Sequence, residues 1–185
     1  MKRLSVKNII LLIVIILLMI PQSRQQIQIV LHKGFAMFSP SVEPEDSLEQ
    51  ISTYNWMLKD LEGNAFDLNN SKGKVTLINL WATWCPPCIA EMPSIQALST
   101  DYKDKIDIIL VSNEDQEVVK RFLKKKNYDL QIYTPTTEAP ETFDVKSIPR
   151  TFLLDRKGNI IIDESGAANW NSEKVRKTID ELLRL

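Results

Sequence analysis

The sequence predicts an α/β fold in which helices cover a central mixed β-sheet. Two near-continuous apolar runs rich in β-forming residues, KVTLINLWAT and KIDIILVSN, are typical of central strands that are covered on both faces. Helical spacing of apolar residues follows each run, and this alternation of strands with helices favours a layered architecture. Because 44% of the 185 residues are hydrophobic, the chain can bury a core without disulfide bonds to hold it.

Residues 1–24 are predicted to be a signal anchor, that is, an export signal retained as a transmembrane segment. Lys2, Arg3 and Lys7 precede the apolar run from Ile9 to Ile20, and positive charge before such a run keeps the N-terminus in the cytoplasm. No Ala-x-Ala-like cleavage site and no cysteine for lipid attachment follow. The run is shorter than the roughly 20 residues that span a bilayer, so the anchor needs an extension at one end. A cleaved signal peptide is the alternative.

Residues 25–45 are predicted to be a juxtamembrane segment that begins at the membrane interface and ends as a linker rich in Ser, Pro and acidic residues. The folded domain is predicted to span residues 46–185. A β-hairpin opens it, because Trp56, Leu58 and Leu61 alternate before a turn with the sequence EGN.

The rest of the domain alternates strands with helices. KVTLINLWAT is followed by a helix that begins at Pro86 and contains Pro93, and KIDIILVSN is followed by the helix DQEVVKRFLKKKN. PRTFLLD and NIIIDESG flank a turn with the sequence RKGN, which predicts two antiparallel neighbours. The closing segment NSEKVRKTIDELLRL is predicted to be an amphipathic helix capped by Asn171 or Ser172.

Composition argues against several classes of function. The 23 Lys and Arg residues against 24 Asp and Glu residues leave a formal net charge of −1, without the basic field that nucleic-acid binding needs. Two cysteines in one Cys-x-x-Cys motif are not the disulfide framework of a small exported domain. Zinc needs three or four ligands, and the single histidine, His32, lies in the juxtamembrane segment. The pair is therefore expected to be redox-active, without a bound metal or cofactor.

The motif WCPPC lies between a predicted buried strand and a predicted helix. Cys85 falls at the helix N-cap, where free N–H groups and the helix dipole favour a thiolate, so its pKa is expected below the free value of about 8.5. Cys88 lies one turn into the helix, which favours Cys85 as attacking nucleophile and Cys88 as resolving thiol. Pro86 and Pro87 suit a first helical turn and stiffen the loop. Trp84 is expected either as an exposed aromatic edge or as a packing residue.

A known family shares these motifs. WCPPC after INLWAT, Pro93 five residues beyond the second cysteine, and SIPRTFLLDRKG near the C-terminus resemble the thioredoxin superfamily. They resemble more closely its membrane-anchored bacterial thiol-disulfide oxidoreductases of the TlpA, ResA and CcmG type, from about Trp56 to the C-terminus. The resemblance implies a thioredoxin-like fold with the hairpin as an N-terminal extension, and Cys85 and Cys88 as the redox pair.

Four further positions acquire expected roles from this resemblance. It implies a cis Pro149 that faces the cysteines and an Ile148 backbone that binds an extended substrate. Asn79 stands where thioredoxin has a buried aspartate, and an amide cannot relay a proton. Glu91, three residues beyond Cys88, matches a glutamate of the ResA-like group, and it is expected to tune the cysteine pKa values and relay protons. A surface helix glutamate is the alternative for Glu91.

The resemblance implies a protein-disulfide reductase that works by dithiol-disulfide exchange. A single-pass anchor would hold the domain on the periplasmic, or extracytoplasmic, side of a bacterial inner membrane. Because that space is oxidising, electrons would come from a membrane thiol donor of the CcdA or DsbD kind. The acceptor would be a disulfide-bonded protein, with apocytochrome c in cytochrome c maturation as the expected example.

Three alternatives are open. An extracytoplasmic disulfide oxidase or isomerase can share the Cys-x-x-Cys motif and differ in which redox form the fold stabilises. A peroxiredoxin-like peroxidase is disfavoured, because NLWATW precedes Cys85 where such enzymes carry Pro-x-x-x-Thr-x-x-Cys. Copper delivery of the Sco type is disfavoured, because it would need Cys-x-x-x-Cys and a histidine within the fold.

Overall fold

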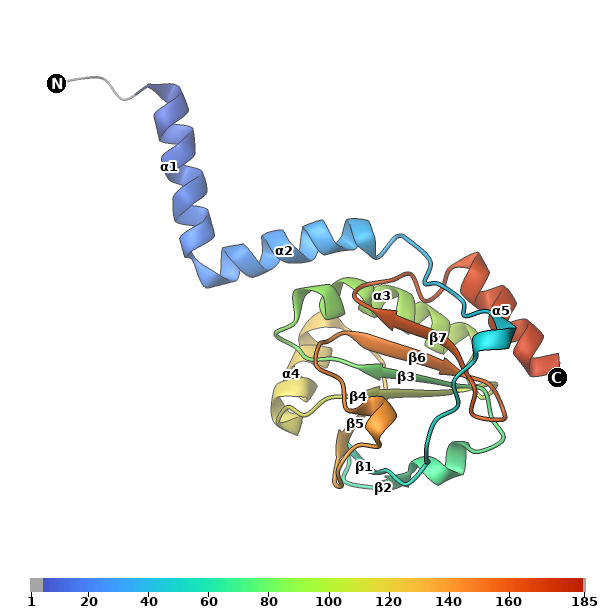
Figure 1. Cartoon of the computed structure of the whole chain (residues 1–185). Helices are drawn as coiled ribbons and strands as arrows, with labels where there is room; N and C mark the ends of the chain where they lie inside the picture. The colour runs from blue at the N-terminus through green and yellow to red at the C-terminus, as the bar shows by residue number, and fades with distance from the viewer. Residues whose placement is uncertain (1–4, 185) are drawn as a thin grey trace.

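The computed structural model describes residues 5–184, and Figure 1 shows a central sheet with helices packed on it. Within this range the sheet has seven strands in the order β2-β1-β5-β4-β3-β6-β7. The strands are β1 (Met57–Asp60), β2 (Ala65–Asp67), β3 (Thr76–Leu80), β4 (Asp107–Val111), β5 (Ile132–Pro135), β6 (Arg150–Leu154) and β7 (Ile160–Ser165). The helices are α1 (Val6–Met19), α2 (Pro21–Phe35), α3 (Pro86–Asp101), α4 (Gln116–Lys126) and α5 (Glu173–Arg184).

The sheet is mixed, as the sequence predicts. β3 runs parallel to β4 and antiparallel to β6, and all five residues of β3 are buried, as expected for a central strand. The predicted hairpin forms from β1 and β2, and β6 and β7 are antiparallel neighbours. β5 has no counterpart in the sequence prediction. It pairs in parallel with β4 and antiparallel with β1, and so joins the hairpin to the sheet.

Helices cover one face of the sheet, and alternate residues of β3 face opposite ways. Leu77 packs in a cluster with apolar residues of α3, α4 and α5, whereas Ile78 and Leu80 pack in a second cluster with Trp56 and Phe143. Because side chains alternate along a strand, Asn79 shares the helix-covered face with Leu77. The strand thereby directs one polar side chain toward α3, next to the cysteines.

The N-terminal segment forms two helices that meet at a sharp bend. α1 ends at Met19 and α2 begins at Pro21, a residue suited to the first helical turn. Figure 1 shows α2 lying along α3 while α1 leads away from the domain. Within residues 5–184, no helix is both long enough and apolar enough to cross a membrane. Lys2 and Arg3, which belong to the predicted anchor, lie outside the described residues.

Part of the segment predicted as a linker is attached to the domain. The backbone N–H of Asn169 donates to the Phe38 carbonyl at 2.8 Å, and the N–H of Glu43 donates to the Ile161 carbonyl at 2.9 Å. The predicted boundary at residue 46 therefore falls within a stretch of chain that already follows the domain surface.

Candidate active site

The two cysteines lie at the start of α3, which follows β3 after a short loop. They are joined by a disulfide with a Cα–Cα distance of 5.3 Å. Cys85 is the N-cap of α3, and its Sγ accepts the backbone N–H of Cys88 at 3.3 Å. Pro86 and Pro87 fill the first turn, where a missing N–H leaves no helical bond unmade. The structure confirms the predicted N-cap position, at which free N–H groups and the helix dipole favour negative charge on Cys85.

Both sulfurs are well covered, but their surroundings differ. Cys85 is 2% exposed and Cys88 is 0% exposed, whereas the adjacent Trp84 is 64% exposed and so presents an aromatic edge at the surface. The Cys85 Sγ lies 3.7 Å from the carbonyl oxygen of Ile148, and the Ile148–Pro149 peptide bond is cis, the form that the resemblance implies. The structure therefore brings the predicted substrate-binding pair beside Cys85.

A groove of about 530 Å³ opens on this side of the pair. Trp84 and Ile148 line it together with apolar residues at and just after the end of β3 and in the segment around Phe143. Glu114, Glu138 and Asp144 also line it, while no lysine or arginine is among its described lining residues. A polypeptide that approaches Cys85 thus meets an apolar floor with acidic edges.

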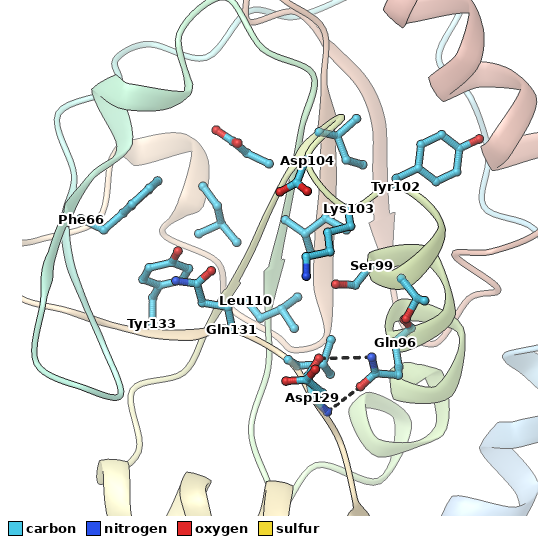
Figure 2. Close-up of a pocket in the computed structure, with 16 residues that line it drawn as sticks. Phe66, Gln96, Ser99, Tyr102, Lys103, Asp104, Leu110, Asp129, Gln131 and Tyr133 are labelled. Carbon is cyan, nitrogen blue, oxygen red and sulfur yellow. Dashed lines mark hydrogen bonds between the residues drawn. The ribbon is translucent and has the colours of Figure 1, made fainter.

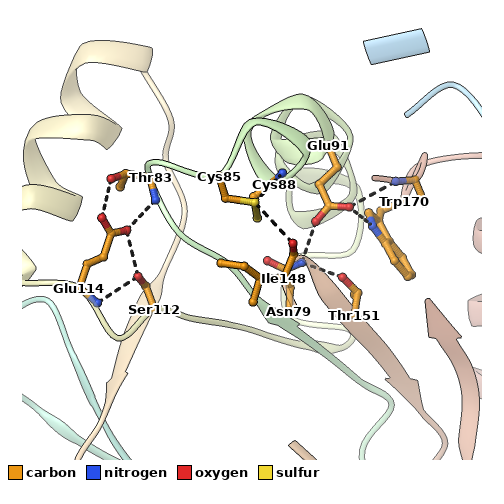
Figure 3. Close-up of a disulfide and its surroundings, with 11 residues drawn as sticks. Asn79, Thr83, Cys85, Cys88, Glu91, Ser112, Glu114, Ile148, Thr151 and Trp170 are labelled. Atoms are coloured by element: carbon orange, nitrogen blue, oxygen red, sulfur yellow. Dashed lines mark hydrogen bonds between the residues drawn. A yellow bond between two sulfur atoms is a disulfide. The ribbon is translucent and has the colours of Figure 1, made fainter. Parts of the chain in front are cut away.

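Glu91 lies on the inner side of the pair and is completely buried (Figure 3). Its Oε1 accepts the Asn79 Nδ2–H at 2.9 Å, and its Oε2 accepts the Trp170 Nε1–H at 3.0 Å and the Ala168 backbone N–H at 3.3 Å. Asn79 also donates to Thr151 Oγ1 at 2.7 Å. The interpretation of Glu91 as a surface glutamate is wrong, and the structure places it with Asn79 as a single polar network inside the core.

Burial raises the pKa of Glu91 from about 4.5 to about 8. The three N–H donors favour the carboxylate and lower the pKa, and the charge of Glu164 raises it further, but loss of hydration has the largest effect. Glu91 consequently carries a proton in most molecules at neutral pH and can release it within the physiological range. A proton that is bound loosely enough to move is what thiol chemistry beside it requires.

A second carboxylate supports the loop before the cysteines. Glu114 Oε2 accepts the backbone N–H of Thr83 at 2.6 Å, and its Oε1 accepts the Thr83 hydroxyl at 2.7 Å. Ser112 Oγ donates to the same carboxylate at 3.3 Å. This two-point contact fixes the loop that carries Trp84 and Cys85 relative to the end of β4 (Figure 3).

Another cavity, of about 490 Å³, lies at the far end of α3 (Figure 2). Its lining includes Gln96, whose side chain donates to the Asp129 carbonyl at 3.2 Å and accepts the Asp129 N–H at 2.8 Å. Neither cysteine lines this cavity.

Sequence reasoning missed three residues that build the site. Trp170 and Thr151 complete the Glu91 network, and Glu114 holds the cysteine loop. No local pattern marks Trp170, which stands alone in AANWN, or Thr151, which reads as one more residue of a strand. Glu114 directly follows a predicted strand, and a polar residue at that position is the one signal that could have drawn attention to it.

Comparisons with known proteins agree with this geometry. The model of the Redoxin family matches residues 39–182. The thiol-disulfide oxidoreductase ResA of Bacillus cereus is 32% identical over 157 residues, which cover 82% of this chain and 86% of that protein. The thioredoxin-like protein YneN of Bacillus subtilis is 29% identical over 130 residues, which cover 68% and 75% respectively.

Solved structures show the same fold. The thioredoxin domain of a thiol-disulfide oxidoreductase from Bacteroides vulgatus matches with a TM-score of 0.59 at 24% identity, over 74% of this chain and 99% of that one. StoA of Bacillus subtilis matches with a TM-score of 0.53 at 24% identity, over 72% and 95%. The chain therefore belongs to the Redoxin family, and it is a ResA-type thiol-disulfide oxidoreductase with a thioredoxin-like fold.

Proposed function

We propose that the protein is a reductase of protein disulfides on the outer side of a bacterial membrane. The observation that carries the direction is the charge around the pair. The Glu114 carboxylate holds the loop before Cys85, Arg150 is paired with Asp163 at 2.5 Å, and Glu91 adds a second negative charge only as pH rises through about 8. A strong oxidant stabilises its reduced form, and cations are what lower a thiol pKa beyond the effect of a helix N-terminus. The charge of Glu114, and that of Glu91 once it ionises, opposes a thiolate, which favours a pair that gives electrons away.

The proposed reaction begins with both cysteines reduced. The Cys85 thiolate attacks one sulfur of a substrate disulfide, forms a mixed disulfide and expels the other substrate sulfur as a thiolate. Cys88 then loses its proton and attacks Cys85 Sγ, which releases the second substrate sulfur. The substrate leaves as two thiols, and the two electrons it gains leave Cys85 and Cys88 joined, which is the state in the structure.

Glu91 is proposed to accept the proton of Cys88 in the second step. Only its ionised form can do so, and that form becomes the major one as pH rises through about 8. The rate of resolution should therefore rise over the same range. Asn79, Trp170 and the Ala168 N–H hold the carboxyl group in place while its charge changes.

Substrate binding is proposed to use the groove beside Cys85. An extended segment would hydrogen-bond to the Ile148 backbone next to Pro149, and Trp84 would cover its side chains. The three carboxylates of the groove favour segments that carry Lys or Arg near their disulfide.

The N-terminal segment is proposed to tether the domain to the membrane. α1 is apolar from Ile10 to Met19, and its described side chains over this stretch are exposed, which suits a lipid environment. Electrons would then come from a membrane thiol donor of the CcdA or DsbD kind. The relatives that bear the name ResA support disulfide-bonded proteins as acceptors, with apocytochrome c as the candidate to examine first.

The experiment is a trap with the Cys88→Ser variant of the full chain in bacterial cells. This variant can make the mixed disulfide but cannot resolve it, so covalent adducts through Cys85 should accumulate on non-reducing gels and disappear with reductant. The double variant Cys85→Ser, Cys88→Ser is the control and should give none. A Cys88→Ser chain that yields no adduct would argue against protein disulfides as substrates.

A further inference from the structure

Helix α2 has an apolar face that the domain does not cover. Ile27, Val30, Leu31 and Phe35 are exposed, and their spacing places them on one side of the helix. The opposite side meets the domain, where Ile29 is buried and α2 packs against α3. The exposed Met37 and Phe38 continue the apolar surface beyond the helix. α2 thus packs on the domain through one side and presents large apolar side chains on the other, a surface suited to a second partner.

The direction of α1 indicates what this partner is. Figure 1 shows α1 leaving the bend at Pro21 on the side away from the domain. The helical spacing and the burial of Ile29 place the apolar face of α2 away from the domain too. The chain bends sharply between the two helices, as it would between a helix entering a bilayer and a helix lying on it. Arg24, three residues before Ile27, lies on the same side of α2 as the apolar face, at a position from which its long side chain can reach anionic headgroups.

We infer that α2 lies in the plane of the membrane with Ile27, Val30, Leu31 and Phe35 in the lipid and the domain held on its other side. This inference rests on the proposed tether and adds the orientation of the domain to it. α2 is then an interfacial amphipathic helix, whose binding comes from buried apolar area and from attraction to anionic lipids. The bilayer surface is the occupant of the apolar face.

The orientation places the cysteine loop at the membrane. Trp84 and Pro86 share a hollow of about 490 Å³ with Met19, Pro21 and Arg24 at the bend between α1 and α2. Trp84 thus lies next to the point where the chain leaves the bilayer. This point is at the membrane–water interface, where indole side chains are favoured. An exchange partner must therefore present its own thiols or disulfide at the bilayer surface, as a membrane protein can.

Tryptophan fluorescence in vesicles tests this arrangement with the full chain. Trp84 is replaced by phenylalanine, which leaves the buried Trp56, Trp81 and Trp170 as a constant background. A new tryptophan is then placed at position 31, on the apolar face, or at position 33, about 200° around the helix. The proteins are reconstituted into vesicles of phosphatidylcholine and phosphatidylglycerol in equal parts, with or without brominated acyl chains, which quench indoles within the lipid.

The expected result is strong quenching and a blue shift for Leu31→Trp, with little of either for Lys33→Trp. Chains that float with the vesicles but show equal, weak quenching at both positions would overturn the in-plane helix and leave the tether standing. Chains that do not float would overturn both. A blue shift at position 31 that grows with protein concentration and is insensitive to bromine would assign the face to a second copy and contradict the inference. Thiol exchange by the unsubstituted chain in detergent reports on the reductase separately.

Discussion

The two sides of the disulfide differ in what they offer to chemistry. The Cys85 side opens toward a groove with an exposed Trp84, the Ile148 carbonyl and acidic edges. The Cys88 side is closed and holds Glu91, which burial keeps largely protonated at neutral pH. In the proposed mechanism, recognition and proton transfer are separated across a single helical turn, so each should be alterable without the other.

The largest effect is expected from removing either sulfur. Cys85→Ser should abolish exchange, because no nucleophile reaches the groove. Cys88→Ser should stop turnover yet leave the first attack intact. Mass spectrometry of each full-length variant after incubation with a disulfide-bonded protein measures the difference, since only Cys88→Ser should gain the mass of the substrate. Adducts on Cys88 in the Cys85→Ser variant, at a rate close to that of the other, would reverse the assignment of the two sides.

Glu91→Gln should have the next largest effect. It should change only the step that depends on Cys88, which is resolution of the mixed disulfide. Without a proton acceptor, resolution of the mixed disulfide should slow by on the order of a hundredfold and lose its rise through pH 8. Stopped-flow measurement of resolution against pH checks this. Glu62→Gln, at an exposed turn position, is the matched control and should behave as the native chain. An unchanged pH profile in Glu91→Gln would remove the carboxyl group from the reaction.

The same residue should make folding stability depend on pH. Because the pKa of Glu91 is higher in the folded chain than in the unfolded chain, the folded state binds the proton more tightly. The resulting stability is fully present below about pH 4.5 and is lost as pH rises toward 8, by a few kcal/mol at most. Denaturant unfolding of the oxidised chain and of Glu91→Gln should show that the substitution flattens this decline. Parallel curves for the two proteins would contradict the pKa shift.

Glu114→Gln should have the smallest effect, on the groove side. Glutamine keeps a hydrogen-bond acceptor for Thr83 but removes one negative charge from the edge of the groove. The rate with a cationic peptide disulfide should fall severalfold and become less sensitive to salt, because steering by charge is screened. The rate with a neutral peptide should change little. An equal fall for both peptides would mean that Glu114 acts through the loop and not through charge.

The fold and the reactive pair could be predicted because their signals are local. The apolar run at β3 and the first turn of α3 specify a cysteine N-cap within ten residues. The expected role of Glu91 was implied by the family resemblance, because helical spacing alone cannot distinguish a buried carboxyl group from an exposed one.

The contacts that hold the site could not be predicted, because they join distant parts of the chain. Trp170 lies 79 residues from Glu91, and Thr151 lies 72 residues from Asn79. β5 was missed because only four residues form it and only Ile132 and Tyr133 are buried. Its pairing depends on β1 and β4, and no local sequence pattern indicates that β5 lies between them.

The reduction potential of the Cys85–Cys88 pair tests the central claim most directly. The full-length chain in detergent micelles would be equilibrated against defined thiol buffers, and its reduced fraction read by alkylation. We expect a value near that of thioredoxin, about −270 mV, because the charge of Glu114, and that of Glu91 once it ionises, opposes the thiolate. A value near about −120 mV, as for a strong oxidant, would contradict it and make the protein a donor of disulfides.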